Sequence, residues 1–91
     1  MRVRFSPEFI SKLKASDVKV RNQFKRKVIL FCRNPNEAIL RNHGLKKDWI
    51  GYRSIDITKD WRAIYTEKVE GKSVVAYFVA IGTHKELYRD K

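Results

Sequence analysis

A nearly continuous apolar run over residues 73–81 constrains the fold of this chain more than any other segment. The run is rich in valine and aromatic residues, which favour a strand. Polar and apolar residues do not alternate along it, as they would in a strand with one solvent-exposed face. A strand of this kind is typical of the interior of a sheet, where both of its faces are covered. We therefore expect residues 73–81 to form a central strand.

Two earlier strands are expected to form a meander with this run. The first is predicted where Ile55 and Ile57 alternate with polar residues, and short turns connect the three strands. The predicted strands are residues 52–57 and 61–66, and the predicted turns are residues 58–60 and 70–72. The short connections imply antiparallel pairing.

The N-terminal part of the chain carries helical signals after a short alternating strand over residues 1–5. Ser6 is a favourable N-cap, and Pro7 is tolerated at the first helical position. Asp17 caps a second predicted helix that continues to about Arg33. The apolar residues expected to face the core are Phe9, Ile10, Leu13, Val20, Phe24, Val28 and Phe31.

Together these elements predict an α+β fold of two layers, with the N-terminal strand and two helices packed on an antiparallel sheet. The order is strand, helix, helix, strand, strand, strand, followed by a short C-terminal turn or helix. A further helical turn is expected over residues 37–40, and Lys27 is expected at the rim of the core. Because the sequence contains no repeat or linker, residues 1–91 are expected to form one domain.

The charge of the chain points to polyanionic partners. Twenty-one Lys and Arg against ten Asp and Glu give a formal net charge of +11, which favours nucleic acid, an acidic protein or an anionic membrane. No apolar run reaches the roughly 20 residues that span a membrane, and Met1 is not followed by a secretory region, so we expect a cytoplasmic protein. Cys32 is the only cysteine, which excludes an internal disulfide. We expect it to be a core thiol.

The chemistry available to this chain is limited, because it lacks a phosphate-binding glycine loop, a metal-ligand cluster and a nucleophile elbow. We therefore expect neither a cofactor nor a metal. Polar residues remain at the ends of the predicted strands: His43, Arg53, Asp56, Asp60, Arg62 and His84. Cleavage of RNA needs a base, an acid and cations, and histidine, with an unperturbed pKa of about 6.5, suits both proton transfers.

Individual roles follow from the side-chain chemistry. Asp60 is suited to act as the base or to orient a histidine, and the guanidinium of Arg62 is suited to hold phosphate oxygens. Tyr88 lies one helical turn beyond His84, so the two side chains can face one site, where the tyrosine ring would stack on a base.

Each candidate also has an ordinary structural interpretation. His43 can cap a helix, His84 can begin a turn, and Asp60 is a common turn residue. Asp56 can simply pair with a neighbouring cation, and the remaining aromatic residues suit core and sheet packing. The residues alone leave both interpretations open.

Several segments resemble one known group of proteins. They are His43-Gly44-Leu45, Gly51-Tyr52-Arg53, residues 60–65 (Asp-Trp-Arg-Ala-Ile-Tyr), and Ile81-Gly82-Thr83-His84 followed by Leu87-Tyr88. With the predicted order of elements, they resemble the RelE/ParE superfamily of toxins from type II toxin–antitoxin systems, and most closely its YafQ-like branch. The likeness covers nearly the whole chain, although the N-terminal half matches only in pattern.

The resemblance implies a ribosome-dependent messenger RNA endonuclease that inhibits translation and uses the RNA 2′-hydroxyl without a metal. It places catalytic positions on His43, Asp60 and His84 and an aromatic position on Tyr88. Asp56 stands where many relatives have another histidine, so Arg53 or Arg62 would carry more of the phosphate binding. The implied partners are the ribosome and messenger RNA, a cognate acidic antitoxin, and operator DNA only within the toxin–antitoxin complex.

Two other classes of function remain open. The first is a ParE-like toxin that acts on DNA gyrase without nuclease activity, and the presence of His43, Asp60 and His84 argues against it. The second is a basic module that binds RNA or protein without catalysis. Cleavage of RNA separates both classes from a nuclease.

Overall fold

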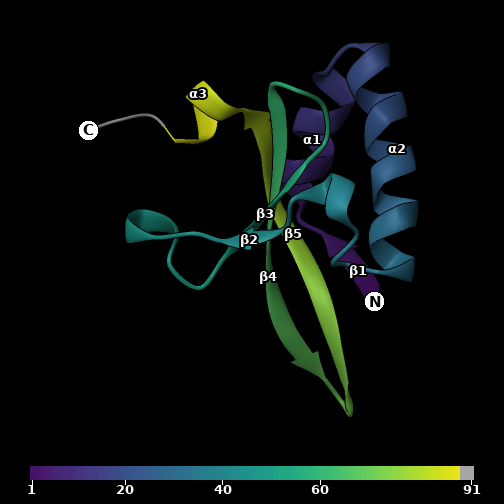
Figure 1. Cartoon of the computed structure of the whole chain (residues 1–91), viewed down its shortest axis with the longest axis vertical. Coiled ribbons are helices and arrows are strands. Elements are labelled where there is room, and N and C mark those ends of the chain that lie inside the picture. The colour runs from purple at the N-terminus through teal and green to yellow at the C-terminus, as the bar shows by residue number, and fades with distance from the viewer. Residues whose placement is uncertain (89–91) are drawn as a thin grey trace.

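The apolar run forms β5 (Ser73–Thr83), which has a strand on each edge. β1 (Arg2–Phe5) pairs with it in parallel, and β4 (Trp61–Glu70) pairs with it antiparallel. The computed structural model describes residues 1–88, and its five strands have the order β1-β5-β4-β3-β2 (Figure 1). The prediction of an interior strand is confirmed.

The strands on the other side of β4 are short. β3 (Arg53–Asp56) pairs antiparallel with β4, and β2 (His43–Gly44) pairs antiparallel with β3. The sequence does not predict β2, because two residues carry no detectable alternation. β4 also continues to Glu70, beyond the expected end at Thr66.

The expectation that residues 73–81 are covered on both faces is wrong for the start of the strand. Val74 is 47% exposed, and its cross-strand partner Val69 is 75% exposed. Burial begins at Val75, because the hairpin of β4 and β5 projects past the helices that cover the rest of the sheet (Figure 1).

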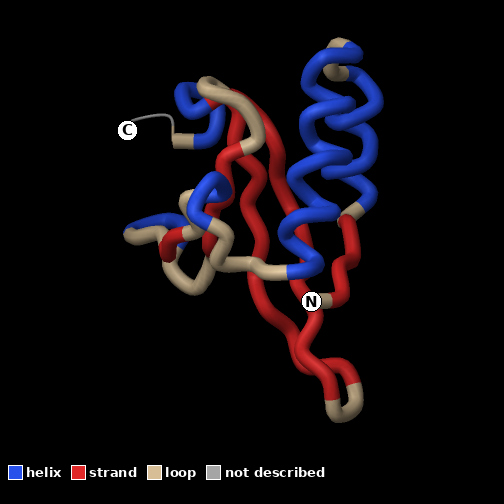
Figure 2. The backbone as a smooth tube through the Cα atoms, turned by 45° about the vertical axis from the view of Figure 1, so that its right-hand side comes forward, coloured by secondary structure: helices blue, strands red, loops and turns tan. Residues whose placement is uncertain are grey.

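Two helices cover one face of the sheet (Figure 2). In α1 (Pro7–Ala15), the hydroxyl of Ser6 accepts a hydrogen bond from the amide of Phe9 at 3.0 Å. In α2 (Val18–Arg33), the carboxylate of Asp17 accepts from the amide of Val20 at 3.0 Å. Both predicted N-caps are confirmed, and each satisfies an amide that the helix itself leaves unpaired.

Aromatic rings form the centre of the core between the helices and the sheet. The ring of Phe78 on β5 lies 5.7 Å from that of Phe9, 5.4 Å from that of Phe31 and 5.2 Å from that of Tyr65. Ile10 was expected in this core but is 40% exposed. Because successive helical residues point about 100° apart, the burial of Phe9 turns Ile10 outward.

Lys27 lies at the rim of the core, as the sequence predicts. Lys27 is half-buried, and its ammonium donates to the carbonyl of Ile57 at 2.8 Å. Cys32 is half-buried rather than enclosed. Among residues 1–88, no helix is long and apolar enough to cross a membrane.

Three further short elements complete the described part of the fold. A 3₁₀ helix over Ala38–Leu40 buries Leu40 and leads into β2. A second 3₁₀ helix, Lys47–Trp49, lies between β2 and β3. The last described element is α3 (His84–Leu87), directly after β5. Figure 2 shows α3 on the opposite side of the sheet from α1 and α2.

Candidate active site

Strand register brings several of the predicted residues to one face of the sheet. Ile55 lies in the core under the helices, so its neighbours Ser54 and Asp56 point to the opposite face. His43 is the cross-strand partner of Ser54, and Arg62 is the partner of Asp56. Directly paired residues share a face, and this face therefore carries an imidazole, a carboxylate and a guanidinium side by side.

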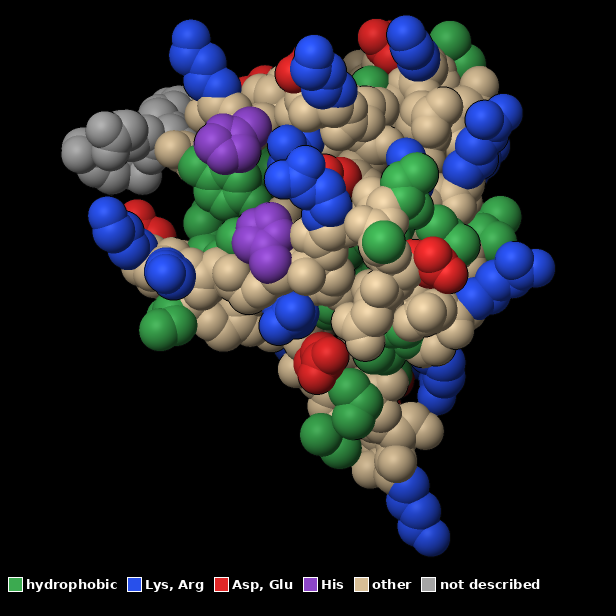
Figure 3. Space-filling model, viewed as in Figure 1, with side chains coloured by type: hydrophobic (Ala, Val, Ile, Leu, Met, Phe, Trp, Pro, Cys, Tyr) green, Lys and Arg blue, Asp and Glu red, His purple; other side chains and the backbone are tan. Residues whose placement is uncertain are grey.

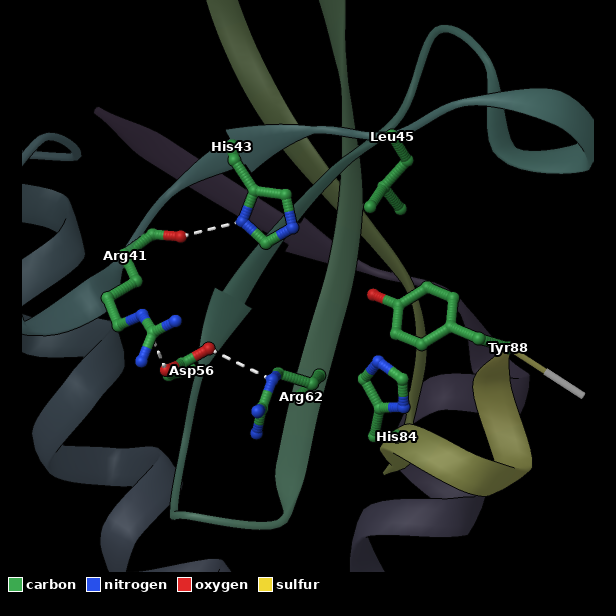
Figure 4. A pocket seen from close by; sticks show the side chains of 7 residues that line it. All are labelled: Arg41, His43, Leu45, Asp56, Arg62, His84 and Tyr88. Atoms are coloured by element: carbon green, nitrogen blue, oxygen red, sulfur yellow. Dashed lines mark hydrogen bonds and ion pairs between the residues drawn. The ribbon is translucent and has the colours of Figure 1, made fainter.

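These side chains line a hollow of about 340 Å³. Its lining residues are Arg41, His43, Leu45, Asp56, Arg62, His84 and Tyr88 (Figure 4). Figure 3 shows both histidines on one face of the molecule, with basic side chains beside them. We call this hollow the histidine pocket.

The tautomer of His43 follows from its hydrogen bond. Its Nδ1 lies 2.8 Å from the carbonyl oxygen of Arg41. A carbonyl oxygen only accepts, so Nδ1 carries the proton and the neutral ring keeps a lone pair on Nε2. His43 can therefore accept a proton at Nε2.

An ion-pair cluster forms the base of the histidine pocket. Asp56 Oδ1 lies 3.0 Å from Arg62 Nε, and both side chains are only 17% exposed. Asp56 Oδ2 lies 3.6 Å from the Nε of Arg41, whose side chain is 77% exposed. One guanidinium nitrogen of Arg62 also donates to the carbonyls of Thr58, Lys59 and Trp61. The cluster of two cations and one anion keeps a positive charge and can attract a phosphate.

α3 supplies the opposite wall. The rings of His84 and Tyr88 lie 4.6 Å apart, at 58° to each other. The hydroxyl of Tyr88 is buried and has no hydrogen-bond partner among residues 1–88. Figure 4 shows that this hydroxyl and the imidazole of His43 point into the same hollow. The phenol is therefore a donor without a partner among residues 1–88, on the wall of this hollow.

Several contacts fix the position of α3. Thr83 and Glu86 form a capping box, in which the Thr83 amide donates to Glu86 at 2.9 Å. This hydrogen bond, together with the nearby ammonium of Lys12, lowers the pKa of the Glu86 carboxyl below its ordinary value. The indole of Trp49 donates to the carbonyl of Leu87 at 3.1 Å. These contacts hold His84, and Tyr88 directly after α3, at the wall of the histidine pocket.

Two predicted site residues lie outside this pocket. Asp60 is exposed in the turn before β4, and its backbone carbonyl accepts from the amide of His84 at 3.0 Å. Arg53 lies three residues before Asp56 on the same strand, so alternation places it on the other face. Its Nε donates to the side-chain oxygen of Asn42 at 2.8 Å.

Two lining residues were not predicted as site residues. Arg41 reaches Asp56 because its backbone is left-handed, with φ at 48°. No sequence signal indicates this conformation, since only glycine and asparagine favour it. Leu45 follows His43-Gly44 directly, and its position in that segment was the one available signal.

The side chains of the histidine pocket can transfer protons and can bind an anionic group such as a phosphate. Its polar groups are two imidazoles, two guanidinium groups, one carboxylate and one phenol. In the part of the chain that the structure describes, no three His, Cys, Asp or Glu side chains are grouped as metal ligands.

Comparison with known proteins gives a consistent set of relatives. A family model described as a bacterial toxin of type II toxin–antitoxin system, YafQ, matches residues 2–89. A search of curated proteins finds no match. The crystal structure of YafQ from E. coli strain BL21(DE3) is similar at a TM-score of 0.75 and 27% identity, covering 97% of this chain and 99% of that one.

Two further solved structures agree. A chain of the crystal structure of the E. coli DinJ-YafQ complex has a TM-score of 0.70 and 28% identity, again over 97% of this chain and 99% of that one. A YoeB/ParE toxin from Agrobacterium tumefaciens has a TM-score of 0.73 over 92% of this chain and 99% of that one. At 18% identity, the latter supports the fold alone.

Proposed function

The chain belongs to the YafQ family of bacterial toxins from type II toxin–antitoxin systems, and from this premise we propose that it is a ribosome-dependent messenger RNA endonuclease. The resemblance stated from the sequence is confirmed at the level of the family and the fold. The observation that carries the proposed activity is the pair of histidines that line one pocket with two arginines and a tyrosine.

The proposed reaction is an attack by the RNA on itself. Nε2 of His43 takes the proton from a 2′-hydroxyl, and the 2′-oxygen forms a bond to phosphorus. The bond from phosphorus to the 5′-oxygen breaks, and protonated His84 gives that oxygen a proton. The products are a 2′,3′-cyclic phosphate and a 5′-hydroxyl, so neither an external nucleophile nor a metal enters the balance.

The remaining pocket residues would stabilise charge and hold the base. Arg62 is fixed by Asp56 and by backbone carbonyls, so it can present its remaining donors to a phosphate oxygen without reorganising. Exposed Arg41 would close on the same group from the solvent side. The ring of Tyr88 would stack on a splayed base, and its hydroxyl would donate to the substrate. Asp60 would act through its backbone, by fixing the amide of His84.

Partners follow from charge and from the family. A net charge of +11 suits the phosphate surface of a ribosome, where basic side chains position a protein without reading sequence. The similarity to the toxin of the DinJ-YafQ complex supports a cognate antitoxin for this chain. We propose that this antitoxin is acidic where it contacts the toxin, and that operator DNA is bound only by the complex of the two.

The test is to map the 5′ ends of messenger RNA after brief induction in bacterial cells. We expect new ends in phase with codons inside translated frames, each carrying a 5′-hydroxyl. His84→Ala should remove these ends. Its imidazole is exposed and makes no hydrogen bond to residues 1–88, so the variant should unfold at the wild-type temperature.

The neighbouring exposed residue provides the control. Lys85→Ala removes a side chain of the same helix and should leave the cleavage pattern unchanged. Cleavage by folded His84→Ala would refute the assignment of the pocket. Growth arrest without new ends would indicate gyrase as the target, and the absence of both effects would indicate a binding module.

A further inference from the structure

We propose that a second hollow, beside the histidine pocket, binds a neighbouring nucleotide of the RNA. This inference rests on the proposed cleavage, because it extends the same substrate. The hollow has a volume of about 310 Å³ and is formed by the segment around β2, the start of β3 and the middle of β4. The residues that carry the argument are Leu45, Tyr52, Arg53 and Glu67.

A preorganised cation lines this hollow. Arg53 is half-buried, and its Nε is held by the side-chain oxygen of Asn42 at 2.8 Å. Asn42 in turn donates to the hydroxyl of Tyr65 at 2.8 Å, and Tyr65 is only 1% exposed. The guanidinium is thus anchored to the core by two successive hydrogen bonds. Binding an anion would then require little further ordering of this side chain.

The other donors of Arg53 remain available. Within residues 1–88, no carboxylate lies within ion-pair distance of it, unlike Arg4, Arg41 and Arg62. The guanidinium lies over Gly44, where a Cβ would be 3.5 Å from Nη1. A half-buried guanidinium with one nitrogen fixed and the others free suits a phosphate oxygen pair.

An aromatic ring in the same hollow can stack on a base. Tyr52 is half-buried in the same hollow, and its ring packs edge-on against that of Trp49 at 5.4 Å. The segment that carries it is tied to β4, because Thr66 donates to the carbonyl of Gly51 at 2.9 Å. A fixed ring beside a fixed cation can stack a base while the phosphate is held.

The two hollows adjoin along β2 and its following residue. Leu45 lines both of them, and His43, two residues earlier, lines the histidine pocket. A single strand with its reacting phosphate at His43 would therefore pass around the edge strand β2 at Leu45 to reach Arg53, which lies on the other face of the sheet. Glu67 also lines the second hollow and opposes an anion there, so its removal should strengthen binding.

The experiment is an amide NMR titration of the whole chain with 2′-O-methyl oligouridylates of two and four nucleotides. The blocked 2′-hydroxyl prevents cleavage, so binding is measured without the reaction. We expect the dinucleotide to shift amides around His43 and His84, and the tetranucleotide to shift those around Tyr52 and Arg53 as well. The tetranucleotide should bind about tenfold or more tightly than the dinucleotide.

Variants separate a specific contact from general charge. Arg53→Gln should abolish the gain of the longer oligonucleotide, whereas Arg26→Gln, an exposed charge on α2, should weaken both probes equally. Tyr52→Leu should reduce the gain without any change of charge, and Glu67→Gln should increase it. Thermal unfolding verifies that each variant is folded.

The outcomes distinguish this proposal from that of cleavage. Shifts confined to the histidine pocket, or equal losses in Arg53→Gln and Arg26→Gln, would overturn the second subsite while leaving the nuclease intact. Shifts at both hollows in a protein that produces no new messenger RNA ends would refute the nuclease and support the subsite as an RNA-binding surface.

Discussion

The pair of Asp56 and Arg62 offers the most direct test of how the pocket is held together. Asp56→Asn keeps the shape of the side chain but removes its charge, which leaves a mostly buried guanidinium without a carboxylate. Breaking a fully buried pair costs about 3–5 kcal/mol, and breaking an exposed pair costs about 0–1 kcal/mol. At 17% exposure, and with three carbonyls still bound to Arg62, we expect a loss of about 1–2 kcal/mol.

For a domain of this size, that loss corresponds to a fall of roughly 5–15 °C in the midpoint of thermal unfolding. The assay is urea unfolding followed by circular dichroism, in a double-mutant cycle of Asp56→Asn with Arg62→Gln. The cycle measures the coupling between the two side chains separately from the cost of each change.

An exposed pair serves as the matched control. Arg4 and Glu70 are also bonded, at 3.1 Å, but their side chains are 54% and 41% exposed. The hydrogen bonds from Arg4 lower the pKa of the Glu70 carboxyl, yet solvent screens this pair, and its cycle should show much weaker coupling. Equal coupling in the two cycles, or none at Asp56, would refute the argument that burial strengthens the Asp56–Arg62 pair.

Three further predictions concern α3. The Glu86 carboxyl has a folded pKa below its ordinary value of 4.5, so its stabilisation is present above that pH and is lost as the pH falls through the folded pKa. The protection factors of the α3 amides, taken relative to the intrinsic exchange rate at each pH, should therefore fall on acidification, and Glu86→Gln should abolish that dependence. Gly82→Ala places a Cβ 2.8 Å from Glu86 Oε1 and should disrupt the capping box, at a loss of about 0.5–1 kcal/mol in urea unfolding; in the Glu86→Ala background the same change should add almost nothing. Trp49→Phe removes the donor to the carbonyl of Leu87, at a loss of about 1 kcal/mol. The Tyr88 amide, which donates to the carbonyl of His84, should then exchange before the core opens. If the Tyr88 amide stayed as protected as the core amides, the Trp49 hydrogen bond would not hold α3 in place.

The sequence predicts the elements well because their signals are local. Ser6 and Asp17 cap the helices where expected, and the valine-rich run forms an interior strand. The error at Ile10 arises because a helical wheel does not show which of two adjacent apolar residues the sheet will contact. The exposure of Val74 depends on how far the helices extend over the sheet, which no local pattern contains.

The site is only partly accessible to the same reasoning. Alternation along β3 already separates Arg53 from Asp56, so the sequence could have assigned them to different faces. The approach of His43 to His84 depends on β2, which is too short to predict. Arg41 enters the pocket through a left-handed backbone that its residue type does not favour. The tertiary arrangement, rather than the pattern, determines these contacts.

The division of the sheet into two unlike faces also affects how such a protein would evolve. The aromatic core lies on one side, whereas the exposed His43 and His84 lie on the other and contribute little to it. In the mechanism that we propose, a single substitution at either histidine would therefore silence the chain without unfolding it. The product would remain a folded decoy, able to titrate an inhibitor away from an active copy. In cells that carry an active and an inactive copy, selection would act on the amount of inhibitor as well as on catalysis.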